Sequence, residues 1–186
     1  MSKAAGHLVF ETAGGPCGVA WSGAGILRFQ LPAADAAAVR RLLLRDGAVA
    51  GTGAPPDFVR AAVTAVQRYF SGEAVDFTDV PLDLSAESGT FRTIYAETRR
   101  LRWGETTTYG ALARAVDAGP EGARLVGQAM ARNPVALIIP CHRVLAAGGR
   151  VGGFSAPGGA QSKLKMLALE GIGVGPPPSA QRAFGF

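Results

Sequence analysis

The segment IIPCHRVL places a cysteine directly before a histidine, between an apolar run and a glycine-rich stretch. This cysteine, Cys141, is one of only two in the chain, and His142 and Arg143 follow it. The thiolate is the nucleophilic form of cysteine, and a nearby imidazole or cation favours it by lowering the pKa of the thiol. The Cys-His pair by itself favours a buried, inert thiol, and a reactive cysteine is the alternative. Cys17 has no charged neighbour and fits the inert alternative better.

A histidine that acts as a base needs a partner that orients its ring. Glu170 is the only acidic residue after Glu121, which makes it the candidate partner. Neighbours on an extended chain point in opposite directions, so contact between Cys141 and His142 requires a turn at Pro140 or a bridging water. A zinc site would need every Cys and His of the chain, at spacings that fit no zinc motif, so we expect no metal.

The overall composition is that of a globular protein with one ordinary domain or two small ones. Of the 186 residues, 48% are hydrophobic and 18% are charged. No apolar run reaches the length of a membrane span or of a signal peptide core, so we expect a cytoplasmic protein with no membrane partner. The net charge of +5 arises in residues 86–186, which carry twelve Lys or Arg and six Asp or Glu. This basic half favours either a polyanionic partner or solubility alone.

Short strands and two helices are predicted in the first half of the chain. Strand-like runs between glycine-rich turns occur at residues 6–13, 15–22 and 25–32. Helical spacing follows at residues 33–46 and 57–70, with a breaker-rich loop at residues 47–56 and Asp57 as the expected N-cap of the second helix. Residues 76–89 contain one more candidate strand and then a linker.

The second half is predicted to be mostly helical. Helical runs cover residues 88–104, 108–117, 120–132 and 160–171. The two middle helices, joined by a short turn, resemble a helix-turn-helix. Residues 135–140 form an apolar strand or a buried extended run, and residues 143–154 have hairpin chemistry that would make a wing. The last helix should bury Leu164, Leu167 and Ala168.

Several segments together resemble the methylated-DNA–protein-cysteine methyltransferases, the O6-alkylguanine-DNA alkyltransferases. IIPCHRVL is similar to the active-site segment of that family, GETTTYGALA to the first element of its helix-turn-helix, and GARLVGQAMARNP to its recognition helix. GGF and LALEG match its later active-site loop and its closing glutamate. The motif-rich part covers residues 91–171, and the first half resembles the family's smaller N-terminal domain through weaker motifs.

The resemblance implies an α/β fold followed by an α-helical part. Residues 1–85 would form a small N-terminal α/β domain, RNase H-like, with a short antiparallel sheet. Residues 86–172 would form a mostly helical, winged-helix-like domain for DNA binding and catalysis. Residues 173–186 would be a flexible tail.

The resemblance also implies DNA repair by a single-turnover, self-inactivating reaction. A methyl or larger alkyl group on O6 of guanine in duplex DNA would be transferred irreversibly to Cys141, with O4-alkylthymine as a further candidate lesion. The reaction would need no cofactor, and a monomer would act on double-stranded DNA that contains alkylated bases. The lesion would leave the base stack to reach the thiol.

Individual residues take roles from the same resemblance. Cys141 would be the nucleophile, His142 a base acting through a bound water, and Glu170 the residue that orients His142. Tyr109 would help rotate the phosphodiester and hydrogen-bond to the leaving base, and Asn133 would tie the recognition helix to the cysteine turn. The expected DNA-binding residues are Arg124, which would fill the gap in the stack, and Thr108, Tyr109, Ala123, Gly127 and Arg132. The expected pocket residues are Pro140, Val144, Gly152, Phe154 and Ser155.

Some residues of the recognition helix leave alternatives open. The small residues at positions 122, 123, 127 and 129 would either let the helix backbone approach DNA closely or serve tight helix packing. Leu125 stands where the family usually has alanine, so it either weakens the approach to DNA or turns inward. Arg102 stands where the family often has proline, and the absence of that proline favours a helix that runs slightly longer at this point. Phe154 replaces a usual tyrosine and lacks its hydroxyl.

Three other functions compete with alkyl transfer. A winged-helix DNA-binding regulator would share the basic half and the helix-turn-helix, yet it would not need Cys141, His142 and Glu170 together. Alkyltransferase-like proteins bind the lesion without repairing it and have another residue in place of the cysteine. A cysteine hydrolase would need an oxyanion hole and turnover. Alkyl transfer is the interpretation that uses all of these residues.

Overall fold

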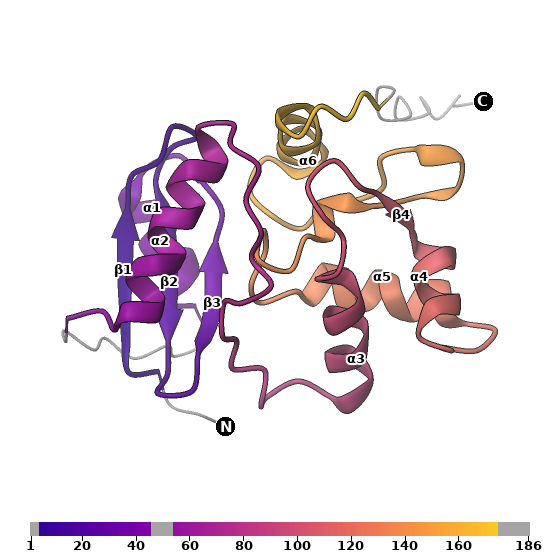
Figure 1. Ribbon diagram of the computed structural model, residues 1–186, viewed down its shortest axis with the longest axis horizontal. Coiled ribbons are helices and arrows are strands. Elements are labelled where there is room, and N and C mark those ends of the chain that lie inside the picture. The colour runs from indigo at the N-terminus through magenta and orange to yellow at the C-terminus, as the bar shows by residue number, and fades with distance from the viewer. Residues whose placement is uncertain (1–3, 46–53, 175–186) are drawn as a thin grey trace, which may run out of the picture.

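The strand-like runs near the N-terminus form one antiparallel sheet. The computed structural model describes residues 4–45 and 54–174, and Figure 1 shows their arrangement. Strands β1 (Gly6–Phe10), β2 (Cys17–Trp21) and β3 (Ile26–Gln30) pair in that order, with Val19 of β2 opposite Leu8 of β1. The three predicted strands are therefore confirmed.

Helices pack on both faces of this sheet because its central strand is apolar on both sides. All five residues of β2 are buried. Gly18 faces α1 (Ala36–Leu43), whose side chains leave no room for a Cβ atom at that position. Cys17 instead belongs to the core cluster that contains Tyr69 of α2 (Asp57–Phe70).

Both predicted N-terminal helices are present, but the bounds of the first and the N-cap of the second differ from the prediction. The helix predicted at residues 33–46 begins only after Asp35, whose side chain accepts a backbone hydrogen bond of the first turn as an N-cap. Helix α2 has the predicted bounds, but its N-cap is Pro56, so the prediction that Asp57 caps it is wrong. Asp57 lies in the first turn, where it pairs with Arg60 and its charge suits the positive end of the helix dipole.

In the described part of the second half, four α-helices follow. Figure 1 shows them beside the three-stranded sheet. They are α3 (Gly89–Thr98), α4 (Tyr109–Ala115), α5 (Gly122–Arg132) and α6 (Gly159–Leu169). Helix α3 stops at Thr98, so the prediction of a helix through residue 104 is wrong. Arg99 caps it, and the Arg99 guanidinium donates to the carbonyl groups of residues 77, 78 and 80. These bonds hold the end of α3 to the segment that joins the two halves.

Two local predictions in the second half are wrong. Residues 135–140 are buried as expected except for the half-buried Ala136, but they form a turn in which Leu137 adopts a φ of 75°. The predicted hairpin does not form, because β5 (Val144–Leu145) pairs in parallel with β4 (Thr107–Thr108). Short 3₁₀ turns, η1 (Cys141–Arg143) and η2 (Ala147–Gly149), lie on either side of β5. The glycine-rich local sequence is compatible with a hairpin, but β5 pairs instead with β4, which lies far from it in the sequence.

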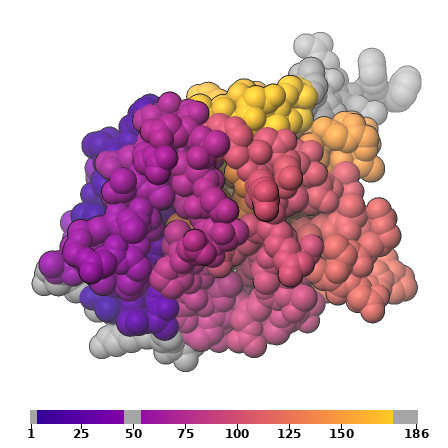
Figure 2. Space-filling model, in the orientation of Figure 1, coloured from indigo at the N-terminus to yellow at the C-terminus, as the bar shows by residue number. Residues whose placement is uncertain are grey.

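One hydrophobic core runs through both halves of the chain. The same cluster contains Trp21 and Tyr69 from the first half and Tyr95, Val126 and Cys141 from the second. At the boundary, the Phe29 amide donates to the Pro134 carbonyl at 3.0 Å. Figure 2 shows the two colour ranges in contact along this boundary. The sheet therefore supports the segment that precedes Cys141.

Two predicted segments lie wholly or partly outside the described residues. The predicted tail at residues 173–186 is described only through residue 174, and the predicted loop at residues 47–56 only from residue 54. Within the described ranges, no helix combines the length and the hydropathy that a bilayer span requires.

Candidate functional site

Cys141 begins the η1 turn directly after the buried turn at residues 135–140. The Cys141 amide donates to the Ile139 carbonyl at 2.8 Å, and the Arg143 amide donates to the Pro140 carbonyl at 2.9 Å. The turn expected at Pro140 is therefore present. It directs His142 and Arg143 toward the end of α6, and it leaves only 5% of Cys141 exposed.

The surroundings of the Cys141 thiol act on its pKa in opposite directions. Burial raises the pKa, and this effect is the largest. A hydrogen bond from the Asn133 side chain, the charge of Lys163 and two backbone amides lower it. The protonated thiol is thus the resting form, and the same polar groups stabilise a thiolate once the proton has left.

His142 and Glu170 form a buried pair. His142 Nε2 lies 2.7 Å from Glu170 Oε1, and both side chains are fully shielded from solvent. Arg143 binds the same carboxylate, with Nε donating to Oε2 at 2.8 Å and Nη2 donating to Oε1 at 2.9 Å. The structure therefore brings together the two residues expected to pair, and it turns Arg143 toward Glu170.

The hydrogen bonds of Glu170 fix its charge and the tautomer of His142. The Tyr69 hydroxyl donates to Glu170 Oε1 at 2.9 Å, and the Gly104 amide donates to Oε2 at 3.3 Å. Burial alone would raise the pKa of Glu170, but hydrogen bonds and charge from His142 and Arg143 lower it to about 2. An ionised carboxylate only accepts hydrogen bonds, so His142 Nε2 carries the hydrogen and Nδ1 keeps a free lone pair.

The free nitrogen of His142 is buried. His142 Nδ1 has no hydrogen-bond partner among the described residues. Burial lowers the pKa of His142, and Glu170 opposes this effect, so the ring is neutral at neutral pH. A neutral imidazole with an unoccupied nitrogen can accept a proton directly or through a water.

A pocket of about 440 Å³ opens at Cys141. Its lining residues are Tyr109, Gly127, Met130, Ala131, Cys141, Gly153, Phe154 and Ser155. The pocket shares Cys141 with a larger groove of about 690 Å³ that passes Arg132 and reaches Leu31 of the first half. Cavities of about 300–1,000 Å³ are typical of small-molecule sites.

Only part of the predicted pocket lining is observed at this pocket. Phe154 and Ser155 line it, as expected. The other three residues do not line it: Pro140 lines another cavity, Val144 is fully buried, and Gly152 packs against the ring of Tyr109. The five expected residues are thus divided between this pocket, another cavity and the core.

Tyr109 and Thr108 stand at the start of α4. The Thr108 side chain caps this helix by accepting a hydrogen bond from the Ala111 amide at 3.1 Å. Tyr109, the first helical residue, lines the pocket. Lys163 Nζ lies 5.8 Å from the centroid of the Tyr109 ring and 6.0 Å from that of Phe154, which is within cation–π range.

Lys163 is an unexpected part of the buried face of α6. Its side chain has no exposed surface, and its ammonium group donates to the Val144 carbonyl at 2.6 Å. Burial lowers the pKa of Lys163, and the nearby Cys141 opposes this shift. Leu167 is buried and Leu164 half-buried, but Ala168 is exposed, so the prediction that Ala168 faces inward is wrong.

Asn133 links α5 to the cysteine turn. It caps the C-terminus of α5, and its side-chain amide donates to the Ile139 carbonyl at 2.9 Å. Its side-chain oxygen accepts a hydrogen bond from the Val135 amide at 3.0 Å. The contact expected between this residue and the segment before Cys141 is therefore present.

Helix α5 separates packing residues from outward-facing ones. Gly122 and Ala129 are buried, and a Cβ atom at position 122 would lie 2.9 Å from the Ala113 side chain of α4. Ala123, Arg124 and Arg132 are exposed, and a Cβ atom at position 127 would meet open space. Of the four small residues, those at positions 122 and 129 thus serve packing. Leu125 turns inward against the core.

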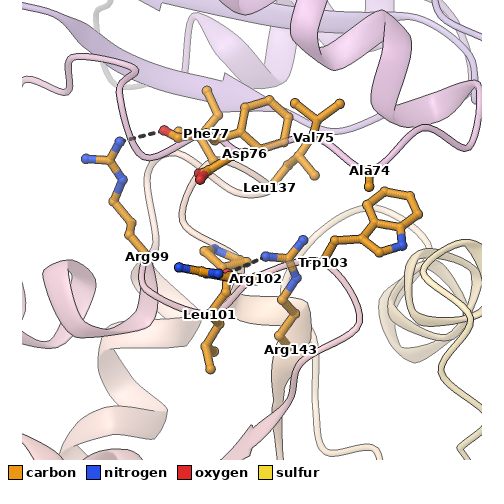
Figure 3. Close-up of a pocket in the computed structure, with 12 residues that line it drawn as sticks. Ala74, Val75, Asp76, Phe77, Arg99, Leu101, Arg102, Trp103, Leu137 and Arg143 are labelled. Atoms are coloured by element: carbon orange, nitrogen blue, oxygen red, sulfur yellow. Dashed lines mark hydrogen bonds between the residues drawn. The ribbon is translucent and has the colours of Figure 1, made fainter.

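Another cavity, of about 370 Å³, lies at the boundary of the two halves and is lined in part by Arg143 (Figure 3). Asp76 and Phe77 line it from the first half, and Trp103 and Arg143 from the second. Arg143 Nη1 donates to the Leu101 carbonyl at 2.6 Å, the bond drawn beside Arg143 in Figure 3. Arg143 is therefore held from two directions, by this carbonyl and by Glu170.

Sequence reasoning misses Tyr69, Lys163 and Gly104. Tyr69 lies on the apolar face of its helix, where the spacing predicts a core residue and nothing more. Lys163 lies four residues before Leu167, and a charged residue on an apolar stripe is the signal that could reveal it. No sequence signal marks the Gly104 amide.

The chain is similar to known proteins over its second half. A family model described as the DNA-binding domain of 6-O-methylguanine DNA methyltransferase matches residues 90–172. The chain is 44% identical over 106 residues to a methylated-DNA–protein-cysteine methyltransferase of Metallosphaera sedula, and 36% identical over 116 residues to one of Methanosarcina acetivorans. The alignments cover 57% and 62% of this chain, and 64% and 70% of those relatives. The chain thus spans about two thirds of the length of the curated relatives it matches.

A relative with a different name is nearly as similar. A DNA base-flipping protein of Thermus thermophilus is 43% identical over 107 residues, which cover 58% of this chain and 69% of that protein. Among solved structures, the fold matches an OGT of Mycobacterium tuberculosis in complex with DNA, with a TM-score of 0.68 and 28% identity. That match covers 88% of this chain and 91% of the other.

Proposed function

Since the chain belongs to the methylated-DNA–protein-cysteine methyltransferase family, we propose that it repairs duplex DNA by moving a methyl or larger alkyl group from O6 of guanine to its own Cys141. Each molecule reacts once, as a monomer and without a cofactor. The observation that carries the proposal is a thiol in a pocket, on the same turn as a buried imidazole that is paired with Glu170 and has one free nitrogen.

The reaction begins with the loss of the thiol proton. His142 Nδ1 takes the proton of Cys141 through a water, and Glu170 balances the charge that forms on the imidazole. The sulfur then bonds to the alkyl carbon, and the bond from that carbon to guanine O6 breaks with its electron pair. The departing guanine takes up one proton through the Tyr109 hydroxyl. His142 then releases the thiol proton through the water, and Tyr109 regains a proton. In the net reaction the sulfur exchanges its proton for the alkyl group, and guanine gains one proton in place of that group.

Lys163 supports the thiolate. Its ammonium group is buried near Cys141 and is held by the Val144 carbonyl, so it cannot turn away into solvent. A positive charge beside a buried sulfur lowers the energy of the anion more than it would in water. Lys163 also lies near the rings of Tyr109 and Phe154, which would form the walls around the extruded base.

The lesion reaches the pocket by rotation out of the duplex, which costs about a few kcal/mol. Arg124 is exposed on α5 and fills the gap left in the stack, while Ala123 and Gly127 let the helix backbone approach the groove. Arg132 and Thr108 bind the flanking phosphates. These roles are supported by the outward-facing side of α5 and by the similarity to a protein solved with DNA.

The proposal extends to organisation and to lesion range. Residues 86–172 form the catalytic and DNA-binding part, winged-helix-like in its helix arrangement, and residues 1–85 form an RNase H-like support. The match of the family model to residues 90–172 supports this division. O4-alkylthymine is a second lesion, which the groove that adjoins the pocket has room to admit.

A mass measurement tests the proposal. Incubation with duplex DNA that contains one O6-methylguanine should add one methyl mass to the Cys141 peptide and restore guanine in the DNA. Cys141→Ser should bind the lesion without transfer. Cys17→Ala is the matched control and should transfer normally, since Cys17 lies buried in β2 and burial raises its pKa to about 12.

Two results would point elsewhere. Lesion-specific binding with no methyl gained by Cys141 would indicate a protein that flips the base without repairing it. Binding that ignores the lesion would indicate a winged-helix regulator.

A further inference from the structure

Within the described chain, one side chain from the first half reaches the Glu170 carboxylate. The Tyr69 hydroxyl, from α2, donates to Glu170 Oε1 at 2.9 Å and lies 3.5 Å from His142 Nε2. We propose that Tyr69 is a positioning residue for alkyl transfer, whose hydroxyl donates to Glu170 Oε1 and so reduces the negative charge that this oxygen presents to the His142 imidazole. The inference rests on the proposed function.

The geometry around Tyr69 is that of a fixed donor. Its side chain is fully buried, and its ring packs edge-on against Phe70 and Trp103, with centroid distances of 5.2 and 5.3 Å. Burial and the charge of Glu170 raise the pKa of Tyr69, so the hydroxyl keeps its proton and donates. The aromatic contacts fix the ring and therefore the position of the hydroxyl oxygen beside Glu170.

The carboxylate has two unequal oxygens, and Tyr69 acts on the one that matters for His142. Glu170 Oε1 faces the Tyr69 hydroxyl, His142 Nε2 and Arg143 Nη2, whereas Oε2 faces Arg143 Nε and the Gly104 amide. Without the hydroxyl, Oε1 would present more negative charge to His142. The pKa of His142 would then rise, because a stronger negative neighbour favours the protonated ring.

The other charged groups around His142 come from its own turn and from α6. Glu170 raises the pKa of His142, and the positive charges of Arg143 and Lys163 lower it. Cys141, the adjacent residue, is a neutral thiol at rest. The second half supplies all of these charges, and α2 contributes the neutral Tyr69 hydroxyl. Through its hydrogen bond to Glu170, this hydroxyl lowers the pKa of His142. The first half of the chain would then take part in the chemistry as well as support it.

Tyr69→Phe removes the hydroxyl and keeps the ring. Single-turnover transfer would be measured across pH, with saturating protein over a methylated duplex. Protonation of His142 blocks transfer at acid pH, so a higher His142 pKa moves the acid limb of the profile upward. For a shift of about one unit, the variant would be about tenfold slower low on that limb and would match wild type on the plateau.

Tyr95→Phe is the matched control. Tyr95 is also fully buried, and its hydroxyl donates to the Ala129 carbonyl at 2.9 Å, away from Glu170. This variant should lose stability and leave the acid limb in place. A uniform loss of rate at all pH values in Tyr69→Phe, or an acid limb unmoved relative to Tyr95→Phe, would overturn the inference.

A second measurement separates this inference from the proposed function. The chain has two histidines, so ¹⁵N-histidine NMR can follow His142 directly, with His7→Gln to assign the signals. The His142 titration should move to higher pH in Tyr69→Phe. If the wild-type protein never alkylates Cys141, the proposed function fails. If the His142 titration is the same in Tyr69→Phe as in wild type, the positioning role of Tyr69 fails, whatever the outcome for the proposed function.

Discussion

At the scale of single residues, the cysteine is buried and carries its proton at rest. Its reactivity therefore depends on groups that act when the proton leaves. His142 offers the proton a free nitrogen, and Lys163 offers the remaining negative charge a buried partner. An ammonium group fully inside the fold is rare, because its desolvation is unfavourable unless a charge or a hydrogen bond compensates. The Val144 carbonyl and the reacting sulfur supply that compensation.

Lys163→Met should raise the pKa of Cys141, because it removes a nearby positive charge and keeps the apolar stem. Transfer near neutral pH should slow about tenfold for a shift of about one unit, and the rate should recover as the pH rises. Transfer rates between neutral and alkaline pH give the measurement. Lys165→Met, an exposed change on the same helix, is the control, and identical profiles for the two variants would contradict the role of Lys163.

At the scale of elements, α5 carries two glycines for different reasons. Gly122 sits where α4 and α5 meet, and there a Cβ atom would come within 2.9 Å of Ala113 and of Ala118. Gly127 lies at the pocket, where a Cβ atom would meet nothing within 4 Å. One glycine therefore sets the spacing of two helices, and the other leaves the outer face open. Two glycines of one helix need not share a purpose.

One substitution at each glycine distinguishes their two roles. Gly122→Ala should lower the free energy of unfolding by about 1–3 kcal/mol, because the added methyl overpacks the α4–α5 contact. Gly127→Ala should leave stability unchanged or slightly raised, since alanine is the better helix former, yet weaken binding to methylated duplex DNA. Urea unfolding and a DNA titration measure the two effects. Equal stability losses would show that position 127 also serves packing.

At the scale of the whole molecule, the first half meets the buried charge cluster of the second half through the Tyr69 hydroxyl. Glu170 and Arg143 face each other at the boundary, with His142 between the pair and the cysteine and Tyr69 arriving from the sheet side. Such a cluster is stable only while every member is present, because a single buried charge without its partner is strongly unfavourable. Removal of one charged member should therefore destabilise the fold at the active site.

The cluster makes stability depend on pH. The unfolded chain binds protons near the ordinary pKa values of His142 and Glu170, 6.5 and 4.5, and the fold lowers both. The folded state then holds fewer protons between those values and the lowered ones. Its stability should fall as the pH drops below about 6.5 and fall further below about 4.5. Urea unfolding from pH 7 to pH 3 would measure this loss.

Glu170→Gln checks the origin of the acid sensitivity. The variant should lose about 3–5 kcal/mol at pH 7, because Arg143 stays buried without its partner, and the further loss below about pH 4.5 should shrink. Glu73→Gln is the control, since Glu73 pairs with Arg68 at a solvent-exposed site. Exposed pairs contribute about 0–1 kcal/mol, so its pH profile should match wild type. An unchanged acid loss in Glu170→Gln would assign the effect to other groups.

The sequence determined the features that depend on neighbours along the chain. The Cys-His pair by itself favoured an inert thiol, and the family resemblance assigned Cys141 as the nucleophile with His142 and Glu170 in support. Strand-like runs between glycine-rich turns predicted the three N-terminal strands, and helical spacing predicted the helices of both halves. The residue types were enough because local spacing sets which side chains share a face. The same local rules misjudged β5, since glycine-rich turns also favour a hairpin that this fold does not use.

Only the tertiary structure decided which distant side chains meet at Glu170. Tyr69 is separated from Glu170 by a hundred residues of chain, and no periodicity distinguishes its hydroxyl from that of any other core tyrosine. Lys163 is placed inward by the Val144 carbonyl, a partner that spacing along α6 cannot indicate. The Tyr69 contact depends on how the first half packs on the second, and the Lys163 contact on how α6 packs on the cysteine turn. Packing is a property of surfaces that form only once the elements exist.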